Sequence, residues 1–189
     1  MVLKTKVAVF ISGTGSNLKN LIKFSKLKKS PIKIDLIISN KSNAAGLNFG
    51  RKYNIKRKIF RFKHHKVDEK KILKHLKKNN ISLICLAGFM KILSKNFIKK
   101  FKGKIINIHP SLLPQYKGLN THSRVLKNKE KFSGCTVHHV SSKLDAGKII
   151  IQKKVKINKN ETPRSLAKKI LKQEHILYPK AIKKLLASL

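Results

Sequence analysis

The chain has 189 residues, of which 41% are hydrophobic, so it is long and apolar enough to bury a core and is not compositionally disordered. It carries 46 Lys and Arg against 7 Asp and Glu, a formal net charge of +39, which predicts weak, salt-sensitive binding to polyanions. No apolar run approaches the ~20 residues of a membrane-spanning helix, and no signal peptide is expected in the amino-terminal segment.

Apolar runs alternate with amphipathic stretches through the first ~110 residues, which predicts alternating strands and helices. The expected strands are residues 6–12, 32–39, 58–62, 81–86 and 104–109. The expected helices are residues 18–27, 44–53, 67–79 and 92–101. This alternation predicts an α/β fold with a mostly parallel, doubly wound, Rossmann-like sheet and helices on both faces. Ligands of such sheets bind at the carboxyl ends of the strands.

The pattern changes in the last third of the chain. Residues 134–140 and 148–157 predict two strands that pair antiparallel through a turn around Asp145. Thr162 and Pro163 are typical of a helix N-cap and first position, and the helix is expected to run almost to Leu189. Pro179 is one place at which this helix could break. No linker or repeat is visible, so residues 1–189 are expected to form a single domain.

A glycine-containing turn follows the first predicted strand. In Gly13-Thr14-Gly15-Ser16-Asn17 the glycines let the backbone approach a ligand, and the amides at the helix start, with Ser16 and Asn17, favour a phosphate. Leu18 stands where the dinucleotide-binding pattern requires Gly or Ala, so a monophosphate is the better candidate. The alternative is an ordinary strand–helix turn that binds no ligand.

A second segment, residues 86–93 (Leu-Ala-Gly-Phe-Met-Lys-Ile-Leu), places apolar side chains around a glycine bend. Such a segment could form the wall of a pocket for a flat heterocycle and offer backbone hydrogen bonds. It could equally be part of the core.

The third feature is the pair Asn107 and His109 on one predicted strand. Because strand side chains alternate, the two point the same way. An amide can donate to a developing oxyanion, and an imidazole can carry a proton. Asp145, 36 residues after His109, could orient the imidazole and raise its pKa, although the sequence leaves open whether it reaches the ring. Ordinary strand-end polar residues are the alternative.

The remaining histidines and the two cysteines suggest no further chemistry. His138 and His139 alternate on one predicted strand, so one of them must face away from any site. No spacing matches a catalytic metal site, so no metal is expected. Two cysteines make no disulfide framework, which favours a reducing, cytoplasmic location. The lysines are spread over the whole chain and Arg is scarce, which favours compositional drift over specific nucleic-acid binding.

These segments, in this order, resemble those of the folate-dependent phosphoribosylglycinamide formyltransferases of purine synthesis. The matching residues are 11–18, 39–41, 86–93, 107–114, 118–122, 137–138, 144–147 and 173–179. The wider formyl-transfer group resembles the chain in its Asn-x-His and Asp elements, but the chain is too short for the extra domains of those relatives.

The resemblance implies transfer of a formyl group from the co-substrate 10-formyltetrahydrofolate to the amine of glycinamide ribonucleotide. It implies catalytic roles for Asn107, His109 and Asp145. The residues expected to hold the ribonucleotide are Gly15, Ser16, Asn17 and Glu174. The residues expected to line the folate pocket are Met90, Lys91, Ile92, Leu93, Asn107, Val140 and Leu144.

Two other functions stay open at this point. One is a formyltetrahydrofolate hydrolase, or another formyltransferase, on the same scaffold. The other is a basic nucleic-acid-binding protein. Lys117 replaces a usual Pro of the family and Asn120 a usual His, and the loss of that imidazole could lower the rate. Beyond the two small-molecule substrates no specific nucleic-acid or membrane partner is expected, and the chain is expected to be a monomer or homodimer.

Overall fold

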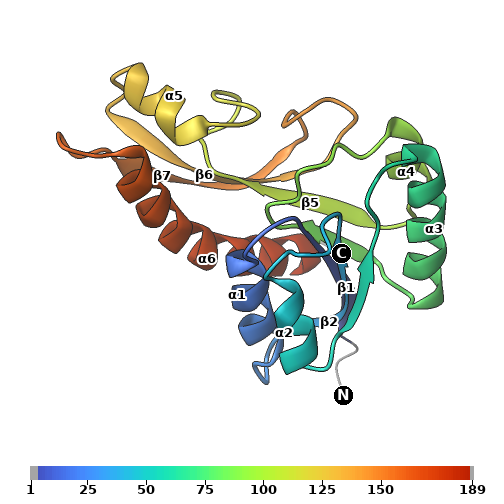
Figure 1. Ribbon diagram of the computed structural model, residues 1–189. Helices are drawn as coiled ribbons and strands as arrows, with labels where there is room; N and C mark the ends of the chain where they lie inside the picture. The colour runs from blue at the N-terminus through green and yellow to red at the C-terminus, as the bar shows by residue number, and fades with distance from the viewer. Residues whose placement is uncertain (1–3, 188–189) are drawn as a thin grey trace. The chain divides into compact units, whose positions relative to one another are not determined.

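The computed structural model describes residues 4–187, and its chain divides into two compact units, residues 1–106 and 107–189 (Figure 1). The boundary falls inside a strand, β5 (Lys104–His109). The catalytic residues predicted from the sequence all belong to the second unit, whereas the glycine-containing turn and residues 90–93 belong to the first.

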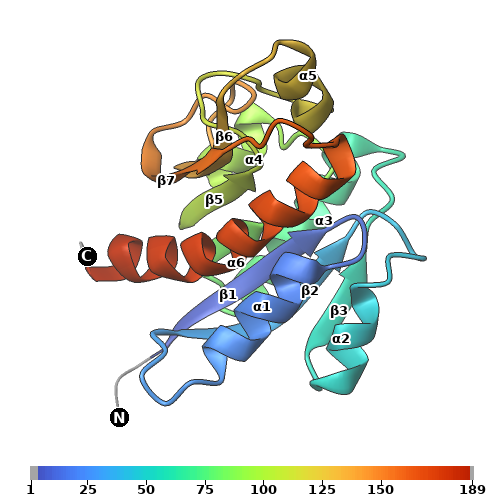
Figure 2. The same cartoon turned by 90° about the vertical axis from the view of Figure 1, so that its left-hand side faces the viewer.

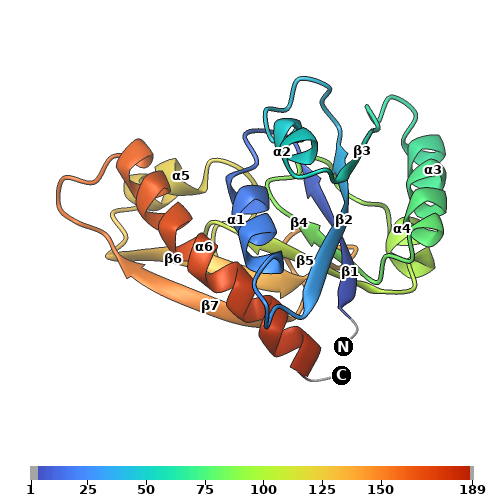
Figure 3. The same cartoon turned by 90° about the horizontal axis from the view of Figure 1, so that it is seen from below.

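The first unit alternates strands with helices, as the sequence predicts. Its elements before β5 are β1 (Thr5–Ile11), α1 (Ser16–Ser25), β2 (Ile32–Ser39), α2 (Leu47–Lys52), β3 (Lys56–Ile59), α3 (His65–Lys78), β4 (Leu83–Leu86) and α4 (Lys95–Lys100). The strands lie in the order β3-β2-β1-β4 and all pair in parallel. Helices α1 and α2 cover one face of these strands, and α3 and α4 cover the other (Figure 1, Figure 3).

The central strand of this unit is apolar without alternation. The side chains from Val7 to Ile11 are all fully buried. Helices on both faces of a parallel sheet leave no solvent-facing side for such a strand, which explains the continuous apolar run. The carboxyl end of β1 then delivers the glycine-containing turn to the edge of the sheet where ligands bind.

The second unit combines the end of β5 with an antiparallel strand pair and a long helix. Its other elements are α5 (Thr121–Lys127), β6 (Phe132–His139), β7 (Ile149–Lys156) and α6 (Pro163–Ala187). Here the strand order is β5-β6-β7, and β6 and β7 pair antiparallel. Helix α6 packs against β6, β7 and α5. The predicted fold class, mostly parallel α/β with an antiparallel pair near the carboxyl end, is confirmed.

Helix α6 begins where the sequence predicts. The Thr162 hydroxyl accepts a hydrogen bond from the backbone N–H of Ser165 at 3.1 Å, which caps the first turn, and Pro163 occupies the first position. The helix does not break at Pro179 but continues to Ala187 (Figure 2). Buried side chains that include Leu177, Tyr178 and Ala181 hold this part of the helix in place.

Several other boundaries differ from the predictions. Helix α4 starts three residues late because the Ser94 hydroxyl caps it, accepting from the Phe97 N–H at 3.0 Å. Strand β3 ends at Ile59, so Phe60 and Phe62 are buried outside it. Helix α5 was not predicted. Among residues 4–187, none of the helices is both long enough and apolar enough to span a bilayer.

Candidate active site

The Asp145 carboxylate is the centre of a cluster of polar side chains in the second unit. Its Oδ2 lies 3.4 Å from His109 Nδ1, and its Oδ1 lies 3.6 Å from His138 Nε2. The Asn107 amide donates to Oδ1 at 3.5 Å and lies 3.2 Å from His138 Nε2. The structure therefore brings the three predicted catalytic residues together and adds His138 to them.

Local backbone geometry explains how these side chains meet. Asn107 and His109 point to the same side because they are two residues apart on β5. Asp145 lies in the turn between β6 and β7 with a φ of +45°. Two residues later, a Cβ on Gly147 would lie 1.7 Å from the His139 carbonyl oxygen, so only glycine allows the turn to pass this close to the end of β6.

Asp145 is held in its ionised form. The backbone N–H of Gly118 donates to Oδ2 at 2.9 Å. Burial acts to raise the pKa of this carboxyl, but the hydrogen bonds from His138 and Gly118 and the nearby His109 outweigh it, so the pKa lies below its usual value. A buried carboxylate that remains charged can position and stabilise an imidazolium.

His109 is bound through both ring nitrogens. Its Nε2 donates to the Tyr116 carbonyl at 2.9 Å, while Nδ1 faces Asp145. Burial lowers the pKa of His109, and the Tyr116 carbonyl and Asp145 oppose this effect without cancelling it. The Ser111 hydroxyl donates to the carbonyl of Gln115 at 2.8 Å, which holds the segment that carries Tyr116. Both ring nitrogens of His109 therefore face oxygen acceptors, the Tyr116 carbonyl and the Asp145 carboxylate.

His138 is the site residue that the sequence left undecided. Its Nδ1 donates to the His139 carbonyl at 2.8 Å, and its Nε2 lies close to both the Asn107 amide and the Asp145 carboxylate. The His138 side chain is 2% exposed. Strand alternation shows only that His138 and His139 face opposite ways. The signal that could have selected His138 was its place, with Val137, among the segments that match the formyltransferases.

The other predicted residues of the second unit lie on α6 and in the β6–β7 connection. Glu174 is buried on the side of α6 that faces β6. Burial and the charge of Glu174 raise the pKa of Cys135, on β6, to about 12. Val140 is half-buried, whereas Leu144 is 52% exposed and available for contact with a ligand.

In the first unit, the glycine-containing turn is tightly packed. Gly15 has a φ of +73°, and a Cβ there would lie 2.7 Å from the Gly46 Cα. Helix α1 begins at Ser16, so Ser16 and Asn17 belong to its first turn, whereas the sequence predicts a turn up to Asn17 and a helix from Leu18.

Ser12 links this turn to the predicted folate segment. Its hydroxyl accepts a hydrogen bond from the Met90 N–H at 2.7 Å and donates to the Asn40 side chain. Met90 and Ile92 are 55% and 63% exposed, Lys91 is exposed, and Leu93 is buried. Exposed apolar side chains beside a polar anchor are suited to contact a ring system.

Metal ligands do not cluster in the described part of the chain. Among residues 4–187, no group of three or more His, Cys, Asp or Glu has the arrangement to hold a metal ion.

Comparisons with known proteins show the family to which the chain belongs. The sequence profile of the formyl transferase family matches residues 5–182. The phosphoribosylglycinamide formyltransferase of Haemophilus influenzae is 39% identical over 181 residues, which cover 94% of this chain and 85% of the relative. The crystal structure of phosphoribosylglycinamide formyltransferase from Brucella melitensis superposes with a TM-score of 0.91 at 40% identity, covering 97% of this chain and 96% of that one.

Longer relatives match as well. The human trifunctional purine biosynthetic protein adenosine-3 is 42% identical over 182 residues, or 95% of this chain. The chain spans only 18% of the length of that relative. On the family profile and the bacterial relative together, the chain belongs to the formyl transferase family and, within it, to the phosphoribosylglycinamide formyltransferases.

Proposed function

We propose that the protein transfers a formyl group from 10-formyltetrahydrofolate to the amine of glycinamide ribonucleotide, a step of de novo purine biosynthesis. Membership of the family supports this reaction. The single observation that carries it is the 3.4 Å approach of His109 Nδ1 to the Asp145 carboxylate, beside the amide of Asn107.

In the proposed reaction the glycinamide nitrogen attacks the formyl carbon directly. A carbon–nitrogen bond to the amine forms, the bond to N10 of the folate breaks, and one proton passes from the amine to N10. The tetrahedral intermediate carries negative charge on the formyl oxygen. The Asn107 amide donates to that oxygen, and a protonated His109 stabilises it through its positive charge. Removal of one oxyanion donor typically costs ~10²–10³ in rate.

Asp145 has two roles in this proposal. It stabilises the protonated form of His109, and it relays the amine proton towards N10, through water where direct reach is lacking. Its lowered pKa supports the first role, because the carboxylate remains charged at neutral pH. The hydrogen bond from Gly118 fixes its orientation.

The binding residues are proposals of the same kind. Gly15, Ser16 and Asn17 would bind the ribose phosphate at the start of α1, and Glu174 would position the glycinamide. The folate would contact the exposed side chains of residues 90–92, with Leu93, Val140 and Leu144. We also propose that residues 1–189 act as one formyltransferase domain, in the cytoplasm and as a monomer or homodimer; the family profile that spans both units supports a single domain.

The test is a formyl-transfer assay with the purified protein and 10-formyltetrahydrofolate, with and without glycinamide ribonucleotide. We expect loss of the formyl group from the folate only when the ribonucleotide is present, with formylated ribonucleotide as product. Release of formate without the ribonucleotide would identify a hydrolase instead. A chelator in both reactions is expected to leave the rate unchanged.

A further inference from the structure

A pocket lies in the first unit, and none of the residues assigned above lines it, although Gly46, between two of its lining residues, packs against Gly15. It has a volume of about 510 Å³, within the range of small-molecule sites. It opens between the loop that follows β2, helix α2 and the edge strand β3. The residues that line it are Ser42, Asn43, Ala44, Ala45, Leu47, Asn48, Arg51, Arg57, Lys58 and Ile59.

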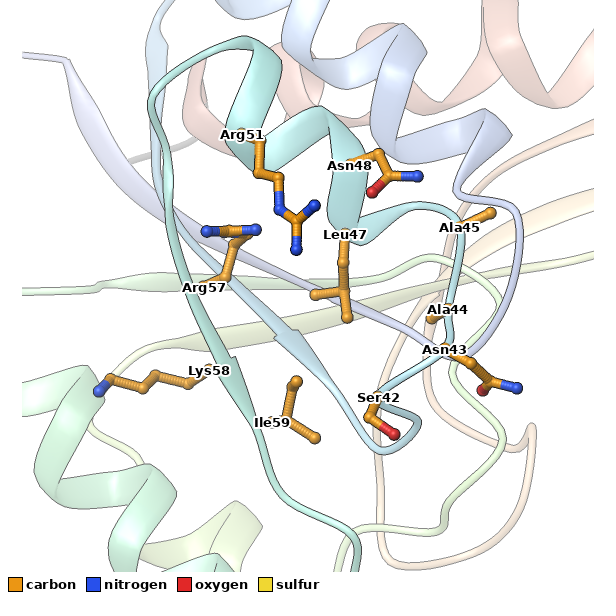
Figure 4. A pocket seen from close by; sticks show the side chains of 10 residues that line it. All are labelled: Ser42, Asn43, Ala44, Ala45, Leu47, Asn48, Arg51, Arg57, Lys58 and Ile59. Carbon is orange, nitrogen blue, oxygen red and sulfur yellow. The ribbon is translucent and has the colours of Figure 1, made fainter.

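Two guanidinium groups occupy one end of this pocket. Arg51 extends from α2 and Arg57 from β3, and both point into the space between these elements (Figure 4). The stem of the exposed Arg57 packs against α2, since a Cβ on Gly50 would lie 2.3 Å from its Cδ. Glycine at position 50 therefore leaves space for the stem of Arg57 next to Arg51, which carries the other guanidinium.

Within the described residues this positive charge has no protein counter-ion. None of the 7 acidic residues of the chain lines the pocket, and within residues 4–187 no ion pair involves Arg51 or Arg57. The ammonium of Lys58 points away from the pocket, towards α3 (Figure 4). Two like charges that converge without a carboxylate repel each other, and a bound anion would remove that repulsion.

The identity of these residues argues against compositional drift. Drift in this chain favours lysine, and only five arginines occur, at positions 51, 57, 61, 124 and 164. Arg124 donates from Nη1 to the carbonyls of Lys117 and Leu119, at 2.6 and 3.4 Å. Two of the remaining four arginines line one pocket. The planar fork of arginine matches a phosphate through paired hydrogen bonds, which lysine cannot reproduce.

The rest of the pocket has the opposite character. Leu47 and Ile59 point towards each other below the arginines, and Ile59 is 44% exposed (Figure 4). Ser42 adds a hydroxyl at the far end. A cationic end, an apolar middle and a polar rim suit a phosphate attached to a flat or partly apolar group.

We infer that the pocket between α2 and β3 binds a phosphate monoester of about nucleotide size, with its phosphate on Arg51 and Arg57 and its organic part over Leu47 and Ile59. A monoester carries close to two negative charges at neutral pH, which matches two guanidinium groups better than a single-charge diester does. The inference does not depend on the proposed formyl transfer, since no residue is shared between the two sites.

The experiment titrates the whole, ¹⁵N-labelled protein with adenosine 5′-monophosphate at near-physiological salt and follows backbone amide resonances. We expect one saturable process that shifts the resonances of residues 42–59. The double variant R51Q/R57Q is expected to weaken binding at least about tenfold. The double variant R51K/R57K, which keeps the charge, is expected to bind more weakly than the natural chain as well.

The matched control is K28Q/K29Q, which removes two exposed charges outside the pocket. It is expected to bind like the natural chain, and equal weakening in it would overturn the proposal in favour of diffuse attraction. If R51K/R57K bound adenosine 5′-monophosphate as tightly as the natural chain, the paired hydrogen bonds of arginine would not be needed. If adenosine bound as tightly as adenosine 5′-monophosphate, the phosphate would not be the group that the pocket recognises. Equal binding at residues 42–59 of an oligonucleotide without terminal phosphate would indicate a nucleic-acid surface, and shifts confined to residues 13–17 would place the ligand at the glycine-containing turn.

Discussion

His109 and Asp145 are 36 residues apart in the sequence, yet Nδ1 of the imidazole lies 3.4 Å from Oδ2 of the carboxylate. Both side chains are less than 10% exposed, at 7% and 8%. In this environment the carboxylate interacts more strongly with a protonated imidazole than it would in water. The pair can therefore stabilise an imidazolium during the proposed formyl transfer.

Asn107→Ala removes the amide that lies beside the pair. We expect a loss of ~10²–10³ in kcat with glycinamide ribonucleotide, the usual cost of one oxyanion donor. The melting temperature should change little, because Asn107 is only half-buried. Asn107→Asp, which keeps the shape and removes the donor, should be similarly slow. A rate within a few-fold of the natural chain in both variants would exclude the amide from the mechanism.

His138→Ala should change the pH profile more than the maximal rate. The hydrogen bond from His138 helps to hold the pKa of Asp145 below its usual value. Its removal raises that pKa, so activity that needs the ionised carboxylate should fall off at a higher pH on the acid side. The profile of kcat/KM against pH measures this shift. His138→Gln, whose amide can still donate, should restore part of it, whereas an unchanged acid limb in His138→Ala would argue that His138 only fills space.

Gly15→Ala and Gly13→Ala form a matched pair in the glycine-containing turn. Alanine at position 15 must adopt a φ of +73° and place its Cβ 2.7 Å from the Gly46 Cα. We expect it to lower the free energy of unfolding by about 1–3 kcal/mol and to raise KM for the ribonucleotide. Alanine at position 13 meets no atom within 4 Å and should change neither quantity by a comparable amount. Denaturant titration and steady-state kinetics check both.

Buried histidines should make the protein less stable in mild acid. Burial lowers the pKa of both His109 and His122, so the unfolded chain binds protons more readily than the folded one. Stability should therefore be complete above the unfolded value of about 6.5 and fall as the pH decreases below it, by at most about 1.4 kcal/mol per pH unit and per histidine. The free energy of unfolding at several pH values measures this.

His122→Asn is the variant that separates this effect from general acid sensitivity. The Nδ1 of His122 is buried, and within the described residues it makes no hydrogen bond, so replacement should not break one. We expect a flatter dependence of the free energy of unfolding on pH between about 5 and 6.5 than in the natural chain. If the free energy of unfolding of the variant depended on pH as steeply as that of the natural chain, groups other than His122 would control the loss of stability in acid.

The sequence predicted the buried strands best. The bounds of β2 and β5 agree with the predictions residue for residue, because Pro31 precedes β2, a polar turn follows it, and Pro110 ends β5. Helix α5 was missed because its seven residues begin after an Asn120 in a left-handed conformation and bury only Thr121 and Val125. So short a helix carries no periodic signal.

The candidate site was predicted in its residues but not in its contacts. Strand alternation placed Asn107 and His109 on one side, whereas the approach of Asp145 depends on the path of the turn between β6 and β7. That path depends on the glycine at position 147, which the turn needs to pass the end of β6. The choice between His138 and His139 likewise depends on which face of β6 meets β5, and one sequence does not contain that information.

The most direct test of the central claim is the rate of formyl transfer by Asp145→Asn at saturating concentrations of both substrates. Asparagine keeps the shape of the side chain and removes the charge that stabilises protonated His109. We predict a loss of at least ~10² in kcat with a nearly unchanged melting temperature, while Lys143→Gln, an exposed change in the same turn, remains fully active. Near-full activity of Asp145→Asn would contradict the account, because formyl transfer would then not need the carboxylate beside His109.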